Sequence, residues 1–197
     1  MAEGLKDAPG KLYAVKADLT KEGDILAAFQ WVKDNLGGVD VLVNNAGMAP
    51  NNNLTDGNTS VWKQLLDLNV LALSICTREA IKSMKERGVN DGHVVHINSI
   101  AGHSVITFSG FYMYSATKHA VTALTEGLRK ELVQEKSNIR VTSVSPGSVD
   151  TDALRGANLP EDMLKAMPKL LPEDIADAVV YALSAPAHVQ VSPMVRQ

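Results

Sequence analysis

Apolar residues in this chain follow two patterns, short unbroken runs and longer stretches in which they recur every three or four positions. The short runs predict strands, at residues 11–17, 39–43, 93–98, 139–145 and 189–195. The periodic stretches predict helices, at residues 23–35, 60–87, 114–135 and 172–184. Because strands and helices alternate, we expect right-handed crossovers and a parallel α/β sheet. We also expect the unbroken run at 39–43 to be buried on both faces.

Polar or glycine-containing clusters follow four of the predicted strands. Asp18 follows the first strand, residues 44–47 (Asn-Asn-Ala-Gly) the second, Ser99 the third, and Pro146 with Gly147 the fourth. Ligands of open parallel sheets bind outside the carboxyl ends of the strands. The clusters therefore predict one binding site along this edge of the sheet.

Composition and charge narrow the class of protein. The 197 residues are 45% hydrophobic and 21% charged, which suits one globular domain spanning 1–197. The formal net charge of −3 argues against nucleic acid binding, and we expect neither a membrane span nor a leader peptide. Cys76 is the only cysteine, so we expect it to be a buried apolar residue in a protein of the reducing cytoplasm. His96 and His103 lack a third ligand at a suitable spacing, so we expect no metal site.

Tyr114 and Lys118 are the first candidates for chemistry. Residues four apart share one face of a helix, so the phenol and the ammonium should lie side by side. A neighbouring cation favours the phenolate, and we therefore expect a lowered pKa for Tyr114, which suits general acid–base catalysis. Tyr112 lacks this arrangement, because Ala116 follows it by four residues. The alternative is a surface tyrosine and lysine that share this spacing by chance.

Ser99 and Asn69 strengthen the catalytic interpretation. Ser99 follows a predicted strand, where its hydroxyl could hold a substrate oxygen for Tyr114; alternatively, it could cap a turn. Asn69 is an amide within an apolar helical stretch, and such a group needs hydrogen-bond partners. It could be structural, but beside the other three residues we favour a role in relaying protons through a water to Lys118.

These residues occur in an order and spacing that resemble the short-chain dehydrogenases/reductases. The matching motifs are Asn-Asn-Ala-Gly at 44–47, Asn-Ser-Ile-Ala-Gly at 98–102, Tyr-Ser-Ala-Thr-Lys at 114–118 and Pro-Gly-Ser-Val-Asp-Thr at 146–151. The resemblance implies a Rossmann-like fold and a catalytic tetrad of Asn69, Ser99, Tyr114 and Lys118. Residues 69–103 and 114–132 resemble the subgroup of insect farnesol dehydrogenases and vertebrate carbonyl and steroid reductases.

The resemblance also implies a cofactor, a substrate class and the residues that bind them. NADP is the expected cofactor, with NAD as the other option, and the substrate would be an alcohol or ketone such as farnesol or a steroid. Asn44 would stabilise the central strand. The implied cofactor-binding residues are Asp18, Asn45, Ala46, Gly47, Tyr114, Lys118, Pro146, Gly147, Val149 and Thr151. The segment 151–169 lies where the family places its substrate loop, and its apolar lining would be Leu154, Leu159, Met163, Leu164 and Met167. Alternatively, these residues form an ordinary amphipathic helix that packs on the core.

One family motif has no match in these residues. The glycine-rich turn Thr-Gly-x-x-x-Gly-x-Gly, which lets a pyrophosphate approach a helix N-terminus, does not occur in the sequence. Our hypothesis is that the chain is N-terminally truncated and lacks the first two βα units. The strand at 39–43 would then have an exposed apolar edge, and the cofactor would bind poorly.

The alternatives to an oxidoreductase are a non-catalytic binding module and a serine hydrolase. A non-catalytic relative could serve as an oligomerisation or binding module, since helices 60–87 and 114–135 commonly form a subunit interface in this family. The intact tetrad argues against this alternative, because a scaffold does not need all four residues. A serine hydrolase using Ser99 is disfavoured, because no Gly-x-Ser-x-Gly motif surrounds it.

Overall fold

A parallel sheet of four strands forms the centre of the protein. The computed structural model describes residues 9–157, 159, 161–191 and 194–196, and its strand order is β1-β2-β3-β4. The strands are β1 (Val41–Asn44), β2 (His93–Ile97), β3 (Arg140–Pro146) and β4 (Met194–Arg196). All neighbouring strands are parallel, with Val43 opposite Val95 and Val95 opposite Thr142. The predicted parallel α/β sheet is therefore confirmed.

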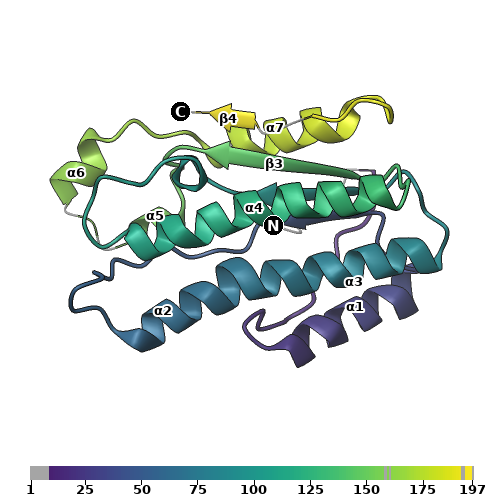
Figure 1. Cartoon of the computed structure of the whole chain (residues 1–197), viewed down its shortest axis with the longest axis horizontal. Helices are drawn as coiled ribbons and strands as arrows, with labels where there is room; N and C mark the ends of the chain where they lie inside the picture. The colour runs from purple at the N-terminus through teal and green to yellow at the C-terminus, as the bar shows by residue number, and fades with distance from the viewer. Residues whose placement is uncertain (1–8, 158, 160, 192–193, 197) are drawn as a thin grey trace.

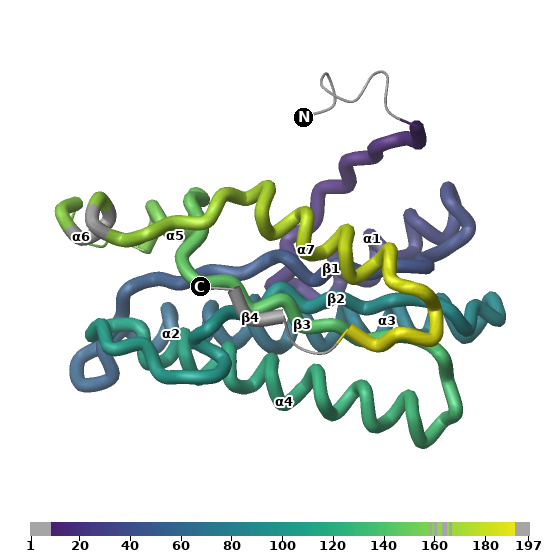
Figure 2. Tube along the Cα trace, turned by 90° about the horizontal axis from the view of Figure 1, so that it is seen from above, coloured from purple at the N-terminus to yellow at the C-terminus, as the bar shows by residue number. Residues whose placement is uncertain are grey.

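Helices cover both faces of this sheet. They are α1 (Glu22–Leu36), α2 (Thr59–Leu66), η2 (Asp67–Ala72), α3 (Leu73–Glu86), η3 (Ile100–Gly102), α4 (Tyr112–Gln134), α5 (Asp152–Arg155), α6 (Glu161–Ala166) and α7 (Pro172–Ser184). Figure 1 shows α1 beside α3, and Figure 2 shows α7 on one side of the strands and α4 on the other. None of the helices in the described part of the chain is both long and apolar enough to cross a membrane.

Separate apolar clusters hold these helices to the two faces. One cluster joins α3 and α4 to the start of β3 and contains Ala80, Met84, Leu132, Ile139 and Val141. A second joins α1 to α3 and contains Ile25, Ala72, Ile75 and Cys76. A third joins α7 to β2 and β3 and contains Val95, Val144, Ile175 and Ala178. Cys76 is thus the small buried apolar residue that its surroundings in the sequence predicted.

The helix ends follow from local sequence. Helix α7 begins at Pro172, whose missing N–H costs nothing in a first turn, and the Leu171 N–H donates to Asp174 Oδ2 at 2.8 Å. Helix α1 ends at Gly37, which has a left-handed φ of 84°. Because these signals are local, the predicted bounds of α7 are correct and those of α1 are within one residue.

The predicted strand at 11–17 is wrong. These residues form no strand, and Leu12 and Tyr13 are 57% and 47% exposed. Figure 2 shows this segment standing away from the sheet, ahead of α1. A strand needs a neighbour for its N–H and C=O groups, and none of the described strands pairs with this segment. Asp18 therefore does not follow a strand.

Strand β1 is an edge strand, and the expectation that it is buried on both faces is wrong. Leu42 packs against the clusters of α1, α3 and α4, but Val41 and Val43 are 46% and 40% exposed on the other face. Helix α7 contacts β2 and β3 and leaves β1 uncovered on that face. The predicted exposure of apolar residues at this edge is thus confirmed. Of the predicted strand at 189–195, residues 189–191 form no strand, residues 192 and 193 lie outside the described residues, and β4 covers Met194–Arg196.

Candidate active site

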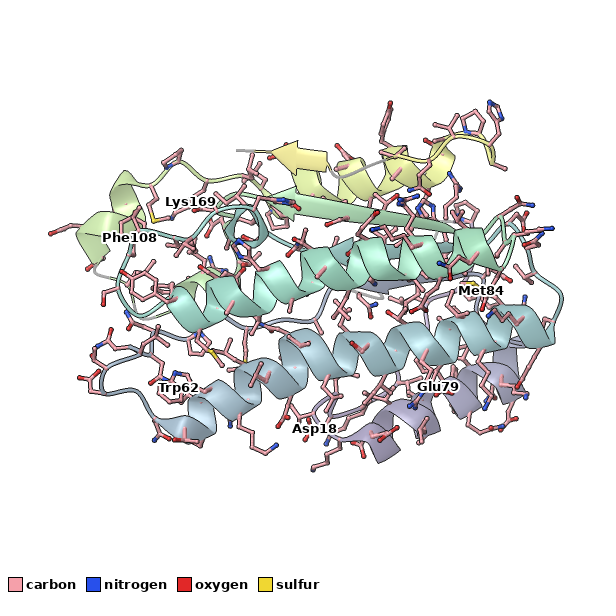
Figure 3. The ribbon with its side chains drawn as sticks, in the orientation of Figure 1. Asp18, Trp62, Glu79, Met84, Phe108 and Lys169 are labelled. Atoms are coloured by element: carbon pink, nitrogen blue, oxygen red, sulfur yellow. The ribbon has the colours of Figure 1, made fainter. Side chains whose placement is uncertain are left out.

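The candidate residues gather where the strands end. In Figure 1, β3 and β4 point toward α5 and α6, and α4 begins at the same end of the molecule. Ser99 lies two residues after the end of β2, Pro146 ends β3, and residues 45–47 follow β1. Figure 3 labels Trp62 and Phe108 at this end and Met84 at the opposite one. These residues therefore lie at the carboxyl edge of the sheet, which is where open parallel sheets bind their ligands.

Ser99 is held by the turn that follows β2. It is the N-cap of the short helix η3, and its Oγ accepts a hydrogen bond from the Ala101 N–H at 3.1 Å. The side chain is buried, at 8% exposure. Burial raises the pKa of Tyr114, and Ser99 acts in the opposite direction on the same phenol. Ser99 therefore caps the turn after β2 and also acts on Tyr114.

The first turns of α4 bring Tyr114 and Lys118 together, as the spacing predicted. The Lys118 Nζ lies 5.8 Å from the centre of the Tyr114 ring. The expectation of a lowered phenol pKa is nevertheless wrong. Burial raises the pKa of Tyr114, and the opposing effect of Ser99 offsets only part of this rise. The phenol therefore carries its proton at neutral pH.

Lys118 is a buried cation with few protein partners. It is 7% exposed, and its Nζ donates to the Ile97 carbonyl oxygen at 2.9 Å. Burial lowers its pKa to about 8. An ammonium has three hydrogens to donate, and among the described residues only one has a protein acceptor. Two donors remain for hydroxyl groups of a ligand.

Asn69 connects the loop after β1 to helix α4. It lies in the π-helical segment η2, a distortion that often occurs at functional sites. Its Oδ1 accepts from the Met48 N–H at 3.0 Å, and its Nδ2 donates to the Met48 carbonyl at 2.9 Å and to Thr117 Oγ1 at 3.1 Å. A Cβ on Gly47 would lie 3.4 Å from Asn69 Oδ1 and 3.9 Å from Lys118 Nζ. Both polar atoms therefore border the space beside Gly47.

The loop after β1 is fixed at its start and open beyond it. Asn44 donates from Nδ2 to Thr77 Oγ1 at 3.0 Å, which ties the end of β1 to α3. Asn45, Ala46 and Gly47 are exposed along the next part of the loop. The structure therefore offers an accessible backbone surface beside Lys118.

The segment after β3 follows a defined path. The Leu170 N–H donates to the Ser148 carbonyl at 2.8 Å, and a β-bridge pairs Val149 with Leu170. Thr151 is the N-cap of α5. Pro146 is buried, and Gly147, Val149 and Thr151 are half-buried. These four predicted cofactor residues thus lie on the edge that also carries Ser99.

Asp18 stands apart from the other candidates. It is exposed, its Oδ1 accepts from the Thr20 N–H and hydroxyl at 3.1 and 2.7 Å, and it pairs with Lys21 at 3.3 Å. Figure 3 shows Asp18 beside the start of α1. Among the described contacts, none joins it to the other candidate residues. Its observed role is to organise the turn before α1.

Residues outside the predicted set also shape the site. Thr117 Oγ1 donates to the Tyr114 carbonyl at 2.7 Å and accepts from Asn69. Thr122 Oγ1 donates to the carbonyls of Gly102 and Lys118, and it accepts from Asn98. The sequence did carry a signal for these threonines. Each is a polar residue on a helix face that packs against the protein, and such a group needs a specific hydrogen-bond partner.

Comparisons with known proteins identify the family of this chain. Residues 1–162 match the family described as short chain dehydrogenase. Dehydrogenase/reductase SDR family member 11 of Homo sapiens is 50% identical over 188 residues, covering 93% of this chain and 72% of that protein. A farnesol dehydrogenase of Aedes aegypti is 48% identical over 189 residues, covering 94% of this chain and 74% of that protein.

Solved structures share the fold. A closed form of serine dehydrogenase complexed with NADP+ superposes with a TM-score of 0.84 at 29% identity, covering 98% of this chain and 79% of that one. A short-chain type dehydrogenase/reductase from Mycobacterium marinum superposes with a TM-score of 0.87 at 24% identity, covering 100% of this chain and 78% of that one. The Rossmann-like arrangement of parallel sheet and flanking helices is therefore shown by structure as well as by sequence.

Proposed function

Because this chain belongs to the short-chain dehydrogenases, a family of NAD(P)-dependent oxidoreductases, we propose that it interconverts an alcohol and a ketone with NADP(H). One observation carries the proposal: the Lys118 Nζ lies 5.8 Å from the centre of the Tyr114 ring, and Ser99 is the side chain that acts to lower the pKa of that phenol. The proposed catalytic residues are Asn69, Ser99, Tyr114 and Lys118. A protonated phenol at neutral pH suits the direction in which a ketone is reduced.

Each residue has a distinct proposed role in that reduction. A nicotinamide cofactor, when bound, supplies the hydride that reaches the carbonyl carbon. Ser99 donates a hydrogen bond to the carbonyl oxygen and orients it toward Tyr114. Tyr114 then gives its phenol proton to that oxygen, which completes the alcohol. Lys118 returns a proton to the phenolate through a water held by Asn69, whose Oδ1 borders the same space as Lys118 Nζ.

The residues around Lys118 fit the ribose end of such a cofactor. Two ammonium hydrogens are free to donate to ribose hydroxyls, and Gly47 leaves open space beside them. Our proposed cofactor contacts are Asp18, Asn45, Ala46, Gly47, Tyr114, Lys118, Pro146, Gly147, Val149 and Thr151. We propose NADP rather than NAD, and the NADP+ complex of a related serine dehydrogenase supports this choice.

An apolar substrate suits the entrance of the site. Val105 and Phe108, in the segment between Ser99 and Tyr114, are 60% and 38% exposed, and Leu54 is 55% exposed. Leu154 and Met167 of the predicted substrate loop are half-buried, whereas the side chains of residues 163 and 164 lie outside the described part of the structure. We propose an isoprenoid alcohol such as farnesol, or a steroid-like ketone. The similarity to a farnesol dehydrogenase supports the former.

The proposed reaction predicts opposite pH dependences in its two directions. Ketone reduction needs the protonated phenol, so its rate should be steady near pH 7 and fall as the pH rises toward the raised pKa of Tyr114. Alcohol oxidation needs the phenolate, so its rate should rise over the same interval. Steady-state rates with NADPH or NADP+ at saturating concentration measure both, and NADH provides the cofactor comparison. Equal pH profiles for the two directions would contradict the proposed acid–base role.

The long helices α3 and α4 offer a surface for a second copy of the chain. A groove of about 660 Å³ runs between them. Its apolar lining includes Leu73, Ile81, Ala123, Leu124 and Leu128. Charged residues of both signs, such as Arg78 and Glu131, border it, so two identical faces could pair their charges. We propose that the enzyme forms homo-oligomers through this groove. A non-catalytic oligomerisation module is not favoured.

A single charge should disrupt this interface. Leu124 lies in the groove and is 38% exposed, so Leu124→Arg should convert the oligomer to a monomer. The matched control is Val180→Arg, because Val180 is exposed on α7, on the opposite face of the sheet. Light scattering after size-exclusion chromatography measures the mass of each variant. An unchanged mass for Leu124→Arg would exclude this groove as the interface.

A further inference from the structure

Asn98 is a buried amide directly before Ser99, and its contacts bind three elements together. Its N–H donates to the Val144 carbonyl at 2.7 Å, which ties the end of β2 to β3. Its Nδ2 donates to Thr122 Oγ1 at 2.9 Å, which ties the same residue to α4. Asn98 is only 3% exposed. The backbone at Ser99 is therefore held from both sides through its neighbour.

Thr122 extends this connection to both sides of the candidate site. Its Oγ1 lies 2.9 Å from the Gly102 carbonyl and 3.2 Å from the Lys118 carbonyl, and it accepts from Asn98. Gly102 ends the turn that Ser99 begins, and Lys118 lies one helical turn before Thr122. One hydroxyl thus links the Ser99 turn to the part of α4 that carries Tyr114 and Lys118.

The packing around this contact leaves little room for movement. A Cβ on Gly102 would lie 2.7 Å from Asn98 Nδ2, 2.8 Å from Asn98 Oδ1 and 2.7 Å from the Lys118 carbonyl oxygen. Such distances are too short for any side chain larger than hydrogen. The Asn98 amide therefore fills the space between the Ser99 turn and α4, and it sets how closely the two approach.

We propose that the Asn98–Thr122 hydrogen bond is a positioning contact that aligns the Ser99 hydroxyl with the Tyr114 phenol. Neither residue touches the reacting atoms, and both act through Ser99 and the start of α4. The proposal rests on the proposed function for its catalytic consequence. Its structural content, the placement of the Ser99 hydroxyl relative to the Tyr114 phenol, can be measured without turnover.

The pKa of Tyr114 reports this alignment, because burial raises it and Ser99 acts to lower it. Lys118 is the charged neighbour of Tyr114 on α4, and none of the variants in this test changes it. Thr122→Val keeps the shape of the side chain but removes the hydroxyl. Thr122→Ser keeps the hydroxyl. Thr125→Val is the matched control, because Thr125 lies on the same helix but its hydroxyl contacts Val121 and His96 instead of the Ser99 turn.

Fluorine NMR of protein labelled with fluorotyrosine provides the measurement. The chain has four tyrosines, and the spectrum of Tyr114→Phe assigns the signal of residue 114. Ser99→Ala should raise the pKa of residue 114 by about 0.5 to 1, the effect of one neutral hydrogen bond. Thr122→Val should raise it toward the Ser99→Ala value, whereas Thr122→Ser and Thr125→Val should match the unmodified chain.

Two outcomes would overturn the proposal. One is a Thr122→Val titration equal to that of the unmodified chain; the other is a Ser99→Ala titration with no rise, since Ser99 would then not act on Tyr114. Asn98→Ser is a second variant, too short to reach Thr122, for use if Thr122→Val does not fold. Circular dichroism checks the folding of each variant.

Kinetics separate this proposal from the proposed function. If both hold, Thr122→Val should lower kcat about 10-fold to 100-fold with little change in the KM for cofactor, because only the alignment of reacting groups is lost. If no variant and no unmodified protein reduces a ketone, the proposed function fails while the titration still decides the positioning role.

Discussion

Tyr114→Phe should lower kcat by about 100-fold to 10,000-fold while leaving the fold intact. The substitution keeps the ring that packs at the start of α4 and removes only the hydroxyl. That hydroxyl is the group on which Ser99 acts and which, in the proposed reaction, gives its proton to the substrate oxygen. Ser99 cannot replace it, because the serine hydroxyl is a far weaker acid, and in the proposed reaction Lys118 passes its proton to the substrate only through the phenol.

Tyr112→Phe is the matched control for this prediction. Tyr112 lies two residues earlier on α4, is 37% exposed, and has Ala116 rather than a lysine one turn later. The loss of the Tyr112 hydroxyl should change kcat by less than about 2-fold. Initial rates at saturating cofactor and ketone compare the two variants. Activity in Tyr114→Phe equal to that in Tyr112→Phe would remove Tyr114 from the mechanism.

Lys118→Met should abolish turnover and at the same time stabilise the protein. Lys118 is 7% exposed, and burial lowers its pKa to about 8 from an ordinary value of 10.5. Between these two values the unfolded chain holds a proton that the folded protein has released, so the free energy of unfolding rises with pH across this interval. Below pH 8 the folded protein bears the full cost of the buried charge. That cost is about 3 kcal/mol at most.

The expected gain in stability is smaller than this cost. Lys118→Met leaves the Ile97 carbonyl without its donor, which costs about 1–2 kcal/mol, so the net gain at pH 7 should be about 1–2 kcal/mol. Urea unfolding at pH 7 and at pH 9.5 measures both the gain and its pH dependence. The gain should shrink at the higher pH, where Lys118 is largely neutral. A gain that does not change with pH would show that the charge of Lys118 carries no such cost.

Features fixed by neighbouring residues could be predicted from the sequence. The bounds of α7 follow from Pro172 and from the acidic residue that binds the Leu171 N–H, and both signals lie within one turn. The Tyr114–Lys118 pairing depends only on helical periodicity, and the order of motifs placed Ser99 at the end of β2. These elements are correct because each one depends on contacts within a few residues.

Features that depend on distant partners could not be predicted in this way. The run at 11–17 has strand-like residues but no described strand to pair with, and β1 lacks a helix over Val41 and Val43. The pKa of Tyr114 was expected to follow its cationic neighbour, but the balance is set by burial, which only the packed structure reveals. For the same reason, the contact of Asn98 with Thr122 was visible only in three dimensions.

The proposed reaction requires Ser99, Tyr114 and Lys118 to be aligned with a substrate carbonyl, and a measurement that follows the hydride tests it. The unmodified protein would be incubated with a ketone and NADPH carrying deuterium at the transferred position of the nicotinamide. Mass spectrometry should find deuterium on the carbinol carbon of the alcohol, and this labelled product should be lost in Tyr114→Phe but kept in Tyr112→Phe. Absence of labelled alcohol from the unmodified protein at saturating NADPH, or equal labelling by both tyrosine variants, would contradict the account.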